Sequence, residues 1–161
     1  MKLLVTGHDG YIGSVFTPMA RSAGHDVTGL DAFWFEGCTL GPEPEAVSAL
    51  RLDVRDAGIG QLRGFDAVVH LAAISNDPVG HLDPARTYEI NHLGSARIAR
   101  LAKRAGVERF IFASSCSLYG AASLVAVRRK IGLKSSSAKV ARTRSARAFD
   151  SPYWRHGIQR S

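Results

Sequence analysis

Cysteines, long apolar runs and acidic residues near the C-terminus are all scarce in this sequence of 161 residues. The two cysteines, Cys38 and Cys116, lie far apart without metal-ligand spacing, which excludes a disulfide framework and a cysteine zinc site; we expect no metal. No apolar run reaches about 18 residues, which excludes a membrane-spanning helix. The first apolar stretch ends at Thr6-Gly7, too early for a signal-peptide core, so we expect a cytoplasmic protein.

The net charge of +7 is distributed unevenly along the chain. Residues 1–120 carry 11 basic and 13 acidic side chains, whereas residues 121–161 carry 10 basic side chains and one acidic one, Asp150. So sharp a shift is typical of a segment that does not share the folding constraints of the rest. We therefore expect a folded domain over residues 1–120 and a basic, poorly ordered tail over residues 121–161.

Apolar runs and turn residues alternate through the chain as far as residue 114. Strands are predicted at 2–6, 26–31, 49–54, 65–71 and 107–114. Between them the pattern predicts helices at 11–23 and 84–105, a short turn or helix at 56–62, and a loop over 32–47. This alternation predicts right-handed crossovers and a parallel α/β sheet covered on both faces, in three layers. No sixth strand can be placed after Gly120, so we expect the sheet to be incomplete on its C-terminal side.

A glycine-rich loop separates the first predicted strand from the first predicted helix. Glycine allows a sharp turn, keeps side chains away from a pyrophosphate and lets the helix pack closely on the strand. The free amides and positive dipole end of the helix then face the phosphates. The segment therefore predicts a dinucleotide site formed by Gly7, Asp9, Gly10, Tyr11, Ile12 and Gly13.

Asp31 ends the second predicted strand, 18 residues after Gly13. A carboxylate there can accept hydrogen bonds from the adenosine ribose hydroxyls. It would also repel a 2′-phosphate, and no arginine lies within several residues in the sequence, which favours NAD over NADP. The alternative is a solvated turn residue with no role in binding.

The order of motifs along residues 1–120 resembles the extended short-chain dehydrogenase/reductases, the NAD-dependent epimerase/dehydratase family that acts mainly on nucleotide sugars. The resemblance implies a Rossmann-type, doubly wound parallel sheet and hydride transfer at a hydroxyl carbon of the sugar. The motifs are Thr6-Gly7-x-x-Gly10-x-x-Gly13, Asp31, Asp53-Val54-Arg55, His70-Leu71-Ala72-Ala73, Asn91-His92-Leu93-Gly94-Ser95 and Ser114-Ser115-Cys116-Ser117-Leu118-Tyr119-Gly120.

The same resemblance implies a role for each matching residue. Asp53 and Val54 would lie against the adenine, with the carboxylate taking its amino group. Ser115 would be the catalytic serine that hydrogen-bonds the reacting substrate oxygen, although a polar strand end that satisfies loop amides is the alternative. The cofactor channel would be lined by Leu71, Ala72 and Ala73, with Asn91 on the following helix also assigned to the cofactor site.

The family's catalytic Tyr-x-x-x-Lys is absent from this sequence. None of the four tyrosines is followed by lysine four residues later, and Tyr119 belongs to the family's Ser-x-x-Tyr-Gly string, whose tyrosine is not the catalytic one. Lys139 lies in the nearest remnant, but Ser135 occupies the tyrosine position and its hydroxyl is too weak an acid and too short. We therefore expect impaired catalysis, and the substrate and the reaction stay open.

Three interpretations of residues 121–161 are available. These residues form a nucleic-acid or acidic-partner arm, a disordered extension, or a segment in which the native reading frame is lost after Gly120. We favour the third interpretation. A truncated NAD-binding relative of the epimerases is the resulting hypothesis. The main alternative is a non-catalytic NAD-binding sensor or interaction protein; pairing of exposed sheet edges leaves a homodimer open.

Overall fold

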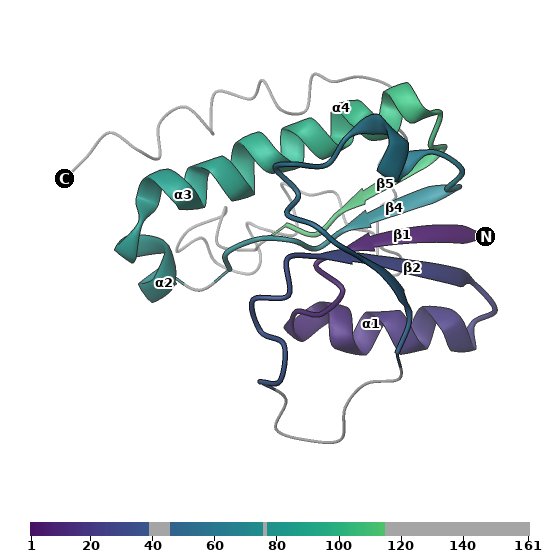
Figure 1. Ribbon diagram of the computed structural model, residues 1–161, viewed down its shortest axis with the longest axis horizontal. Helices are drawn as coiled ribbons and strands as arrows, with labels where there is room; N and C mark the ends of the chain where they lie inside the picture. The colour runs from purple at the N-terminus through teal and green to yellow at the C-terminus, as the bar shows by residue number, and fades with distance from the viewer. Residues whose placement is uncertain (39–45, 76, 115–161) are drawn as a thin grey trace, which may run out of the picture.

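Five parallel strands form one sheet at the centre of the computed structural model, which describes residues 1–38, 46–75 and 77–114 (Figure 1). The expected tail, residues 121–161, lies outside these described residues. In chain order the elements are β1 (Lys2–Thr6), α1 (Tyr11–Ser22), β2 (Asp26–Asp31), β3 (Ser48–Arg51), η1 (Ile59–Leu62), β4 (Ala67–His70), α2 (Asp77–Leu82), α3 (Pro84–Tyr88), η2 (Glu89–Gly94), α4 (Ser95–Ala105) and β5 (Arg109–Phe112).

The strand order β3-β2-β1-β4-β5 gives the sheet two halves that grow in opposite directions from β1. α1 covers one face, and α4 covers the other, with α3 and α2 continuing beyond the sheet (Figure 1). The direction of winding reverses between β1 and β4, and ligands of such sheets bind beyond the carboxyl ends of the strands at this point. The predicted three-layer, doubly wound parallel fold is confirmed. The expected incompleteness beyond β5 concerns residues outside the described part of the chain.

Alternation along the strands divides the core into two apolar layers. In β1, Leu4 points to the side of α4, whereas Leu3 and Val5 point to the side of α1. The larger layer buries Leu4, Leu30, Val54, Ala57, Leu62, Val68, Ile90, Ile98, Leu101, Ala102, Val107 and Phe110. The smaller layer buries Leu3, Val5, Ala20, Val27, Ala67 and Val69.

The predicted helix over 84–105 is continuous but not uniform. Asp83 caps its start, where its carboxylate accepts a hydrogen bond from the Arg86 amide at 2.9 Å. α3 then passes through η2, a turn of wider π-helical winding, into α4 without a break. The wider turn carries Asn91, which matters for the site described below. α2 precedes this helix and was not predicted, because Pro78 and Gly80 interrupt any apolar period.

Three predicted strands are shorter than expected. The fourth, predicted at 65–71, spans Ala67–His70, and local hydrogen bonds limit the third and the fifth. The third strand, predicted at 49–54, spans Ser48–Arg51, since the Asp53 carboxylate accepts the Arg55 amide and turns the chain. The fifth strand, predicted from 107, begins at Arg109, because the Val107 amide donates to the Ala102 carbonyl and completes the helix end.

Candidate functional site

The glycine loop between β1 and α1 is packed too tightly to accept side chains at two positions. Gly7 has φ +73°, and a Cβ there would lie 2.6 Å from the backbone nitrogen of Ala72. A Cβ on Gly13 would overlap the Gly7 carbonyl oxygen and the backbone of His8. The loop therefore lies directly on the segment after β4, which brings the predicted residues Gly7, Gly13, Leu71 and Ala72 together.

The N-terminus of α1 presents backbone amides toward the same region. The first hydrogen bond within the helix runs from the Ser14 amide to the Gly10 carbonyl at 2.8 Å, so the amides of residues 11–13 have no acceptor inside α1. No acidic residue occupies the first turn of this helix. The side chains of Tyr11 and Ile12 are exposed. These two residues can therefore serve a phosphate through their amides, which is the role that the loop predicts.

The Asp31 carboxylate is fixed at the end of β2 by two backbone amides. The Asp9 amide donates to Oδ2 at 3.0 Å, and the Phe33 amide donates to Oδ1 at 2.9 Å. Each carboxylate oxygen can accept a further hydrogen bond, so both retain capacity for a ribose hydroxyl. The bond from Asp9 ties Asp31 to the glycine loop, so these predicted site residues also come together.

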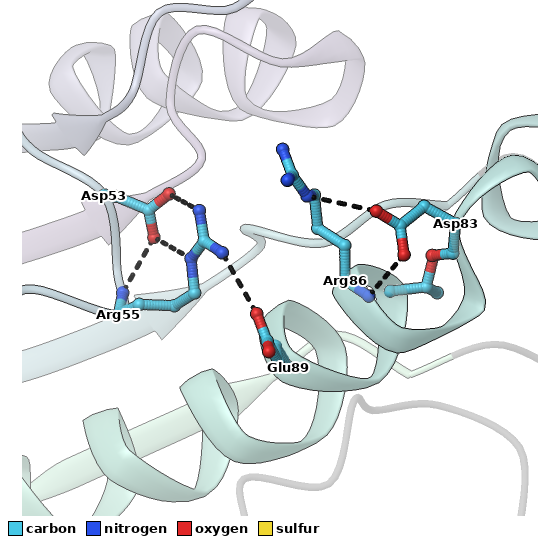
Figure 2. Close-up of polar contacts among 6 residues, drawn as sticks. Asp53, Arg55, Asp83, Arg86 and Glu89 are labelled. Atoms are coloured by element: carbon cyan, nitrogen blue, oxygen red, sulfur yellow. Dashed lines mark hydrogen bonds and ion pairs between the residues drawn. The ribbon is translucent and has the colours of Figure 1, made fainter.

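The Asp53 carboxylate is held by Arg55, which sequence reasoning did not assign to the site. The Arg55 amide and Nε donate to Oδ1 at 2.8 Å and 3.0 Å, and a terminal nitrogen donates to Oδ2 at 2.8 Å. Hydrogen bonds from Arg55 lower the pKa of Asp53. Figure 2 shows Arg55 between the carboxylates of Asp53 and Glu89, the latter 3.3 Å from the guanidinium. Oδ1 thus takes two hydrogens and Oδ2 one, which leaves Oδ2 able to accept an adenine amino hydrogen.

Asn91 fixes the segment that follows β4. Its Nδ2 donates to the Ile74 carbonyl and its Oδ1 accepts the Ile74 amide, both at 2.8 Å. The predicted channel residues Leu71, Ala72 and Ala73 lie immediately before this clamp, with Ala73 exposed and the other two half-buried. The side chain that was predicted to belong to the cofactor site is therefore engaged with the backbone beside the channel. Val54, by contrast, is buried in the core, so its side chain is not available to an adenine ring.

A buried polar chain beneath the site was also missed. His70 Nδ1 lies 2.6 Å from Thr6 Oγ1, and His70 Nε2 lies 2.8 Å from Ser95 Oγ. The imidazole packs against the rings of Phe110 and Phe112 on the adjacent strand β5. Burial lowers the pKa of His70 to about 4, so the ring is neutral near pH 7. The one available signal is a histidine that ends the apolar run of β4, which by itself does not identify its partners.

The predicted catalytic residue Ser115 lies outside the described residues, as do Tyr119 and Lys139. Among the described residues, no helix is long and apolar enough to cross a bilayer. The described part of the chain also contains no cluster of three or more acidic, histidine or cysteine side chains arranged to hold a metal ion.

Comparison with known proteins assigns the family. The sequence profile of the NAD dependent epimerase/dehydratase family matches residues 3–143. The chain therefore belongs to the NAD dependent epimerase/dehydratase family, whose members act on nucleotide sugars. The match runs past Gly120, where we expect the folded domain to end, so the position of that boundary stays a prediction.

The particular relatives are nucleotide-sugar enzymes. A UDP-glucose 4-epimerase of Klebsiella pneumoniae is 30% identical over 129 residues, covering 74% of this chain and 93% of that protein. A UDP-glucose 4-epimerase of Streptomyces lividans is 34% identical over 124 residues, covering 74% of this chain and 37% of that protein. The crystal structure of a UDP-glucose-4-epimerase from Stenotrophomonas maltophila with bound NAD and formylated UDP-arabinopyranose matches with a TM-score of 0.67 at 29% identity, covering 74% of this chain and 38% of that one. The chain thus spans less than half of the latter two proteins.

Proposed function

We propose that this chain binds NAD beyond the carboxyl ends of β1, β2 and β4, as part of a protein that transfers hydride at a hydroxyl carbon of a nucleotide sugar. The observation that carries the proposal is the packing of the glycine loop, where Gly7 and Gly13 leave no room for a Cβ. Such a loop, followed by a helix N-terminus without a competing carboxylate, fits a pyrophosphate. The family and the NAD bound in the Stenotrophomonas relative support the same cofactor.

Each part of the proposed site has a defined task. When bound, NAD supplies the hydride acceptor. Asp31 accepts hydrogen bonds from the adenosine ribose through the free capacity of its two oxygens. Asp53, oriented by Arg55, accepts the adenine amino group through Oδ2. Small residues at 72 and 73 leave space for the ribose and pyrophosphate along the segment that Asn91 holds in place.

We further propose that the 161 residues bind NAD but turn over substrate poorly. The supporting observation is that the sequence contains no Tyr-x-x-x-Lys, so no phenol and ammonium are spaced to remove the proton from a sugar hydroxyl as hydride leaves. Ser115 remains the proposed partner of the substrate oxygen. The division into a cofactor-binding domain over residues 1–120 and a basic tail over residues 121–161 is part of this proposal.

A calorimetric titration with NAD tests the binding step. We expect saturable binding of one NAD per chain, and a marked loss of affinity in Asp31→Leu, because the ribose loses its acceptor. Absence of NAD binding by correctly folded protein would contradict the proposal. Incubation with UDP-glucose and NAD tests turnover, for which we expect no conversion; epimerisation at an ordinary enzymatic rate would contradict impaired catalysis.

A non-catalytic NAD-binding sensor or interaction protein is the second candidate function. The observation that favours it is the combination of a complete glycine loop with the missing Tyr-x-x-x-Lys. It requires NAD binding without turnover and, in addition, a protein partner whose affinity changes when NAD is bound. A saturable, NAD-dependent association would favour this candidate over an impaired enzyme.

A further inference from the structure

A guanidinium lies beside the acidic end of β2, although no arginine is near Asp31 in the sequence. Arg51 of β3 is the register partner of Asp31, and side chains of register partners project from the same face of a sheet. The Arg51 Cζ lies 4.2 Å from the centre of the Phe33 ring, and the Phe33 amide donates to Asp31 Oδ1. Phe33 therefore contacts both the Asp31 carboxylate and the Arg51 guanidinium, at the end of β2 where the adenosine ribose is predicted to bind.

Phe33 holds this arrangement in one conformation. Its φ of 56° is one that a bulky residue adopts only when its surroundings hold it there. The Phe33 ring also packs edge-to-face with the His8 ring, at a centroid distance of 5.3 Å. The His8 ring in turn fits over Gly29, where a Cβ would overlap it. Phe33 therefore links the Arg51 guanidinium on one side to the buried His8 ring of the glycine loop on the other.

Glu36 forms an ion pair with the Arg51 guanidinium. A terminal nitrogen of Arg51 donates to Glu36 Oε1 at 2.7 Å, and the two side chains are 59% and 60% exposed. A guanidinium is a planar fork of five donors whose geometry matches two oxygens of a phosphate. Released from Glu36, Arg51 has the chemistry that accepts the 2′-phosphate by which NADP differs from NAD.

Resting on the proposed NAD site, we propose that Glu36 and Arg51 form a specificity-determining pair that disfavours NADP. Glu36 withholds the guanidinium from a 2′-phosphate and adds its negative charge to that of Asp31. Asp31 by itself selects NAD by accepting ribose hydroxyls, and His8 Nδ1 lies 3.9 Å from its Oδ2. Glu36 engages Arg51, the guanidinium that could otherwise pair with the 2′-phosphate of the competing cofactor. The identity of residue 36 therefore controls how strongly NADP is rejected, while NAD binding is nearly independent of it.

The test is calorimetric titration of the full chain with NAD and with NADP, for wild type and for Glu36→Gln. The matched control is Glu108→Gln, which removes the same charge from an exposed glutamate just before β5, at the opposite end of the strands. We expect Glu36→Gln to bind NADP roughly threefold to tenfold more tightly than wild type, with NAD affinity changed less than about twofold. The gain is expected to shrink at high salt, because exposed charges are screened.

A second substitution, at Arg51, tests whether the gain in NADP affinity comes from the released guanidinium. Introducing Arg51→Leu into Glu36→Gln should abolish the gain in NADP affinity, and Glu108→Gln should show none. An equal gain in Glu36→Gln and Glu108→Gln, or a gain that survives Arg51→Leu, overturns the inference, as does an unchanged NADP affinity in Glu36→Gln when wild type binds NAD. A wild-type chain that binds neither dinucleotide overturns the proposed function, and this inference with it.

Discussion

His70 Nε2 lies 2.8 Å from Ser95 Oγ and joins the last residue of β4 to the first residue of α4 inside the core. On its other side the ring meets the Thr6 hydroxyl at the end of β1. A neutral imidazole has one donor and one acceptor nitrogen, and the two hydroxyls can complement either tautomer. The segment predicted to line the cofactor channel begins at the next residue, Leu71. These hydrogen bonds therefore hold the end of β4 from which that segment starts.

Acid should unfold the protein partly through His70. The pKa falls from 6.5 to about 4 on folding, so the folded state favours the neutral ring. The stability that this provides is complete above pH 6.5 and is lost as the pH falls from 6.5 toward 4, up to about 3 kcal/mol. Urea unfolding at several pH values between 7.5 and 4.5 measures the loss.

Two variants isolate the histidine contribution from that of other titrating groups. His70→Gln keeps hydrogen-bonding capacity but does not titrate, so its stability should fall less steeply over this pH range than that of wild type. His81→Gln removes an exposed histidine and should leave the wild-type slope unchanged. Identical slopes for wild type and His70→Gln would show that His70 does not carry the acid sensitivity.

Gly13→Ala should disrupt the cofactor loop. The added methyl would overlap the Gly7 carbonyl oxygen and His8, so α1 has to move away from the loop that it supports. We expect a loss of about 1–3 kcal/mol of stability and at least a tenfold loss of NAD affinity. Gly60→Ala is the control, because a Cβ there meets nothing within 4 Å. Urea unfolding and NAD titration of both variants check the expectation, which fails if they behave alike.

The fold could be predicted because its determinants are local. The apolar runs of β1, β2 and β4 and the glycines after β1 specify buried parallel strands joined by helices, and each signal lies within a few residues. The end of β3 could not be read in this way. Leu52, Asp53 and Val54 alternate like a strand, but the Asp53 carboxylate accepts the Arg55 amide and the Asp53 carbonyl accepts the Asp56 amide, which turns the chain.

The parts of the candidate site that belong to a single sequence motif could be predicted. The glycine loop and Asp31 lie together as expected, because both follow from the geometry of one β1-α1-β2 unit. Contacts between distant segments were not predictable. Asn91 hydrogen-bonds Ile74, which lies 17 residues earlier in the chain, and Arg51 stands beside Asp31 in the sheet only because β2 and β3 pair in this register. No local pattern specifies either relationship.

Arg55→Met should release the Asp53 carboxylate. Without the guanidinium, the pKa of Asp53 should rise back toward its ordinary value of 3.8, because its strongest hydrogen bonds are gone. In wild type the lowered pKa provides stability above pH 3.8 that is lost as the pH falls through the folded value. In Arg55→Met this acid sensitivity should shrink, although the residue-55 amide still donates to the carboxylate. We also expect NAD affinity to fall by about 1 kcal/mol, or roughly fivefold, as the carboxylate loses its orientation.

The control for this change is Arg86→Met, which breaks a similar but exposed pair with Asp83, 3.3 Å apart on the neighbouring helix (Figure 2). NMR titration of the carboxyl carbons reports the Asp53 pKa, and calorimetry reports NAD affinity. Arg86→Met should alter neither quantity. A pKa for Asp53 that stays low in Arg55→Met would assign the shift to another group.

Asn91 should act on the cofactor through the backbone that it holds. Asn91→Leu leaves the amide and carbonyl of Ile74 without these partners, at a cost of about 1–3 kcal/mol, and frees the segment that lines the channel. Hydrogen exchange at the Ile74 amide should accelerate, and NAD affinity should fall in parallel.

Asn91→Asp separates positioning from direct contact. A carboxylate still accepts the Ile74 amide but cannot donate to the Ile74 carbonyl, so exchange protection and NAD affinity should both lie between those of wild type and Asn91→Leu. If NAD affinity falls in Asn91→Leu while Ile74 exchange keeps its wild-type rate, Asn91 contacts the cofactor directly and does not act through the loop. Agreement between the two readouts across all three proteins instead identifies Asn91 as the residue that positions the channel wall.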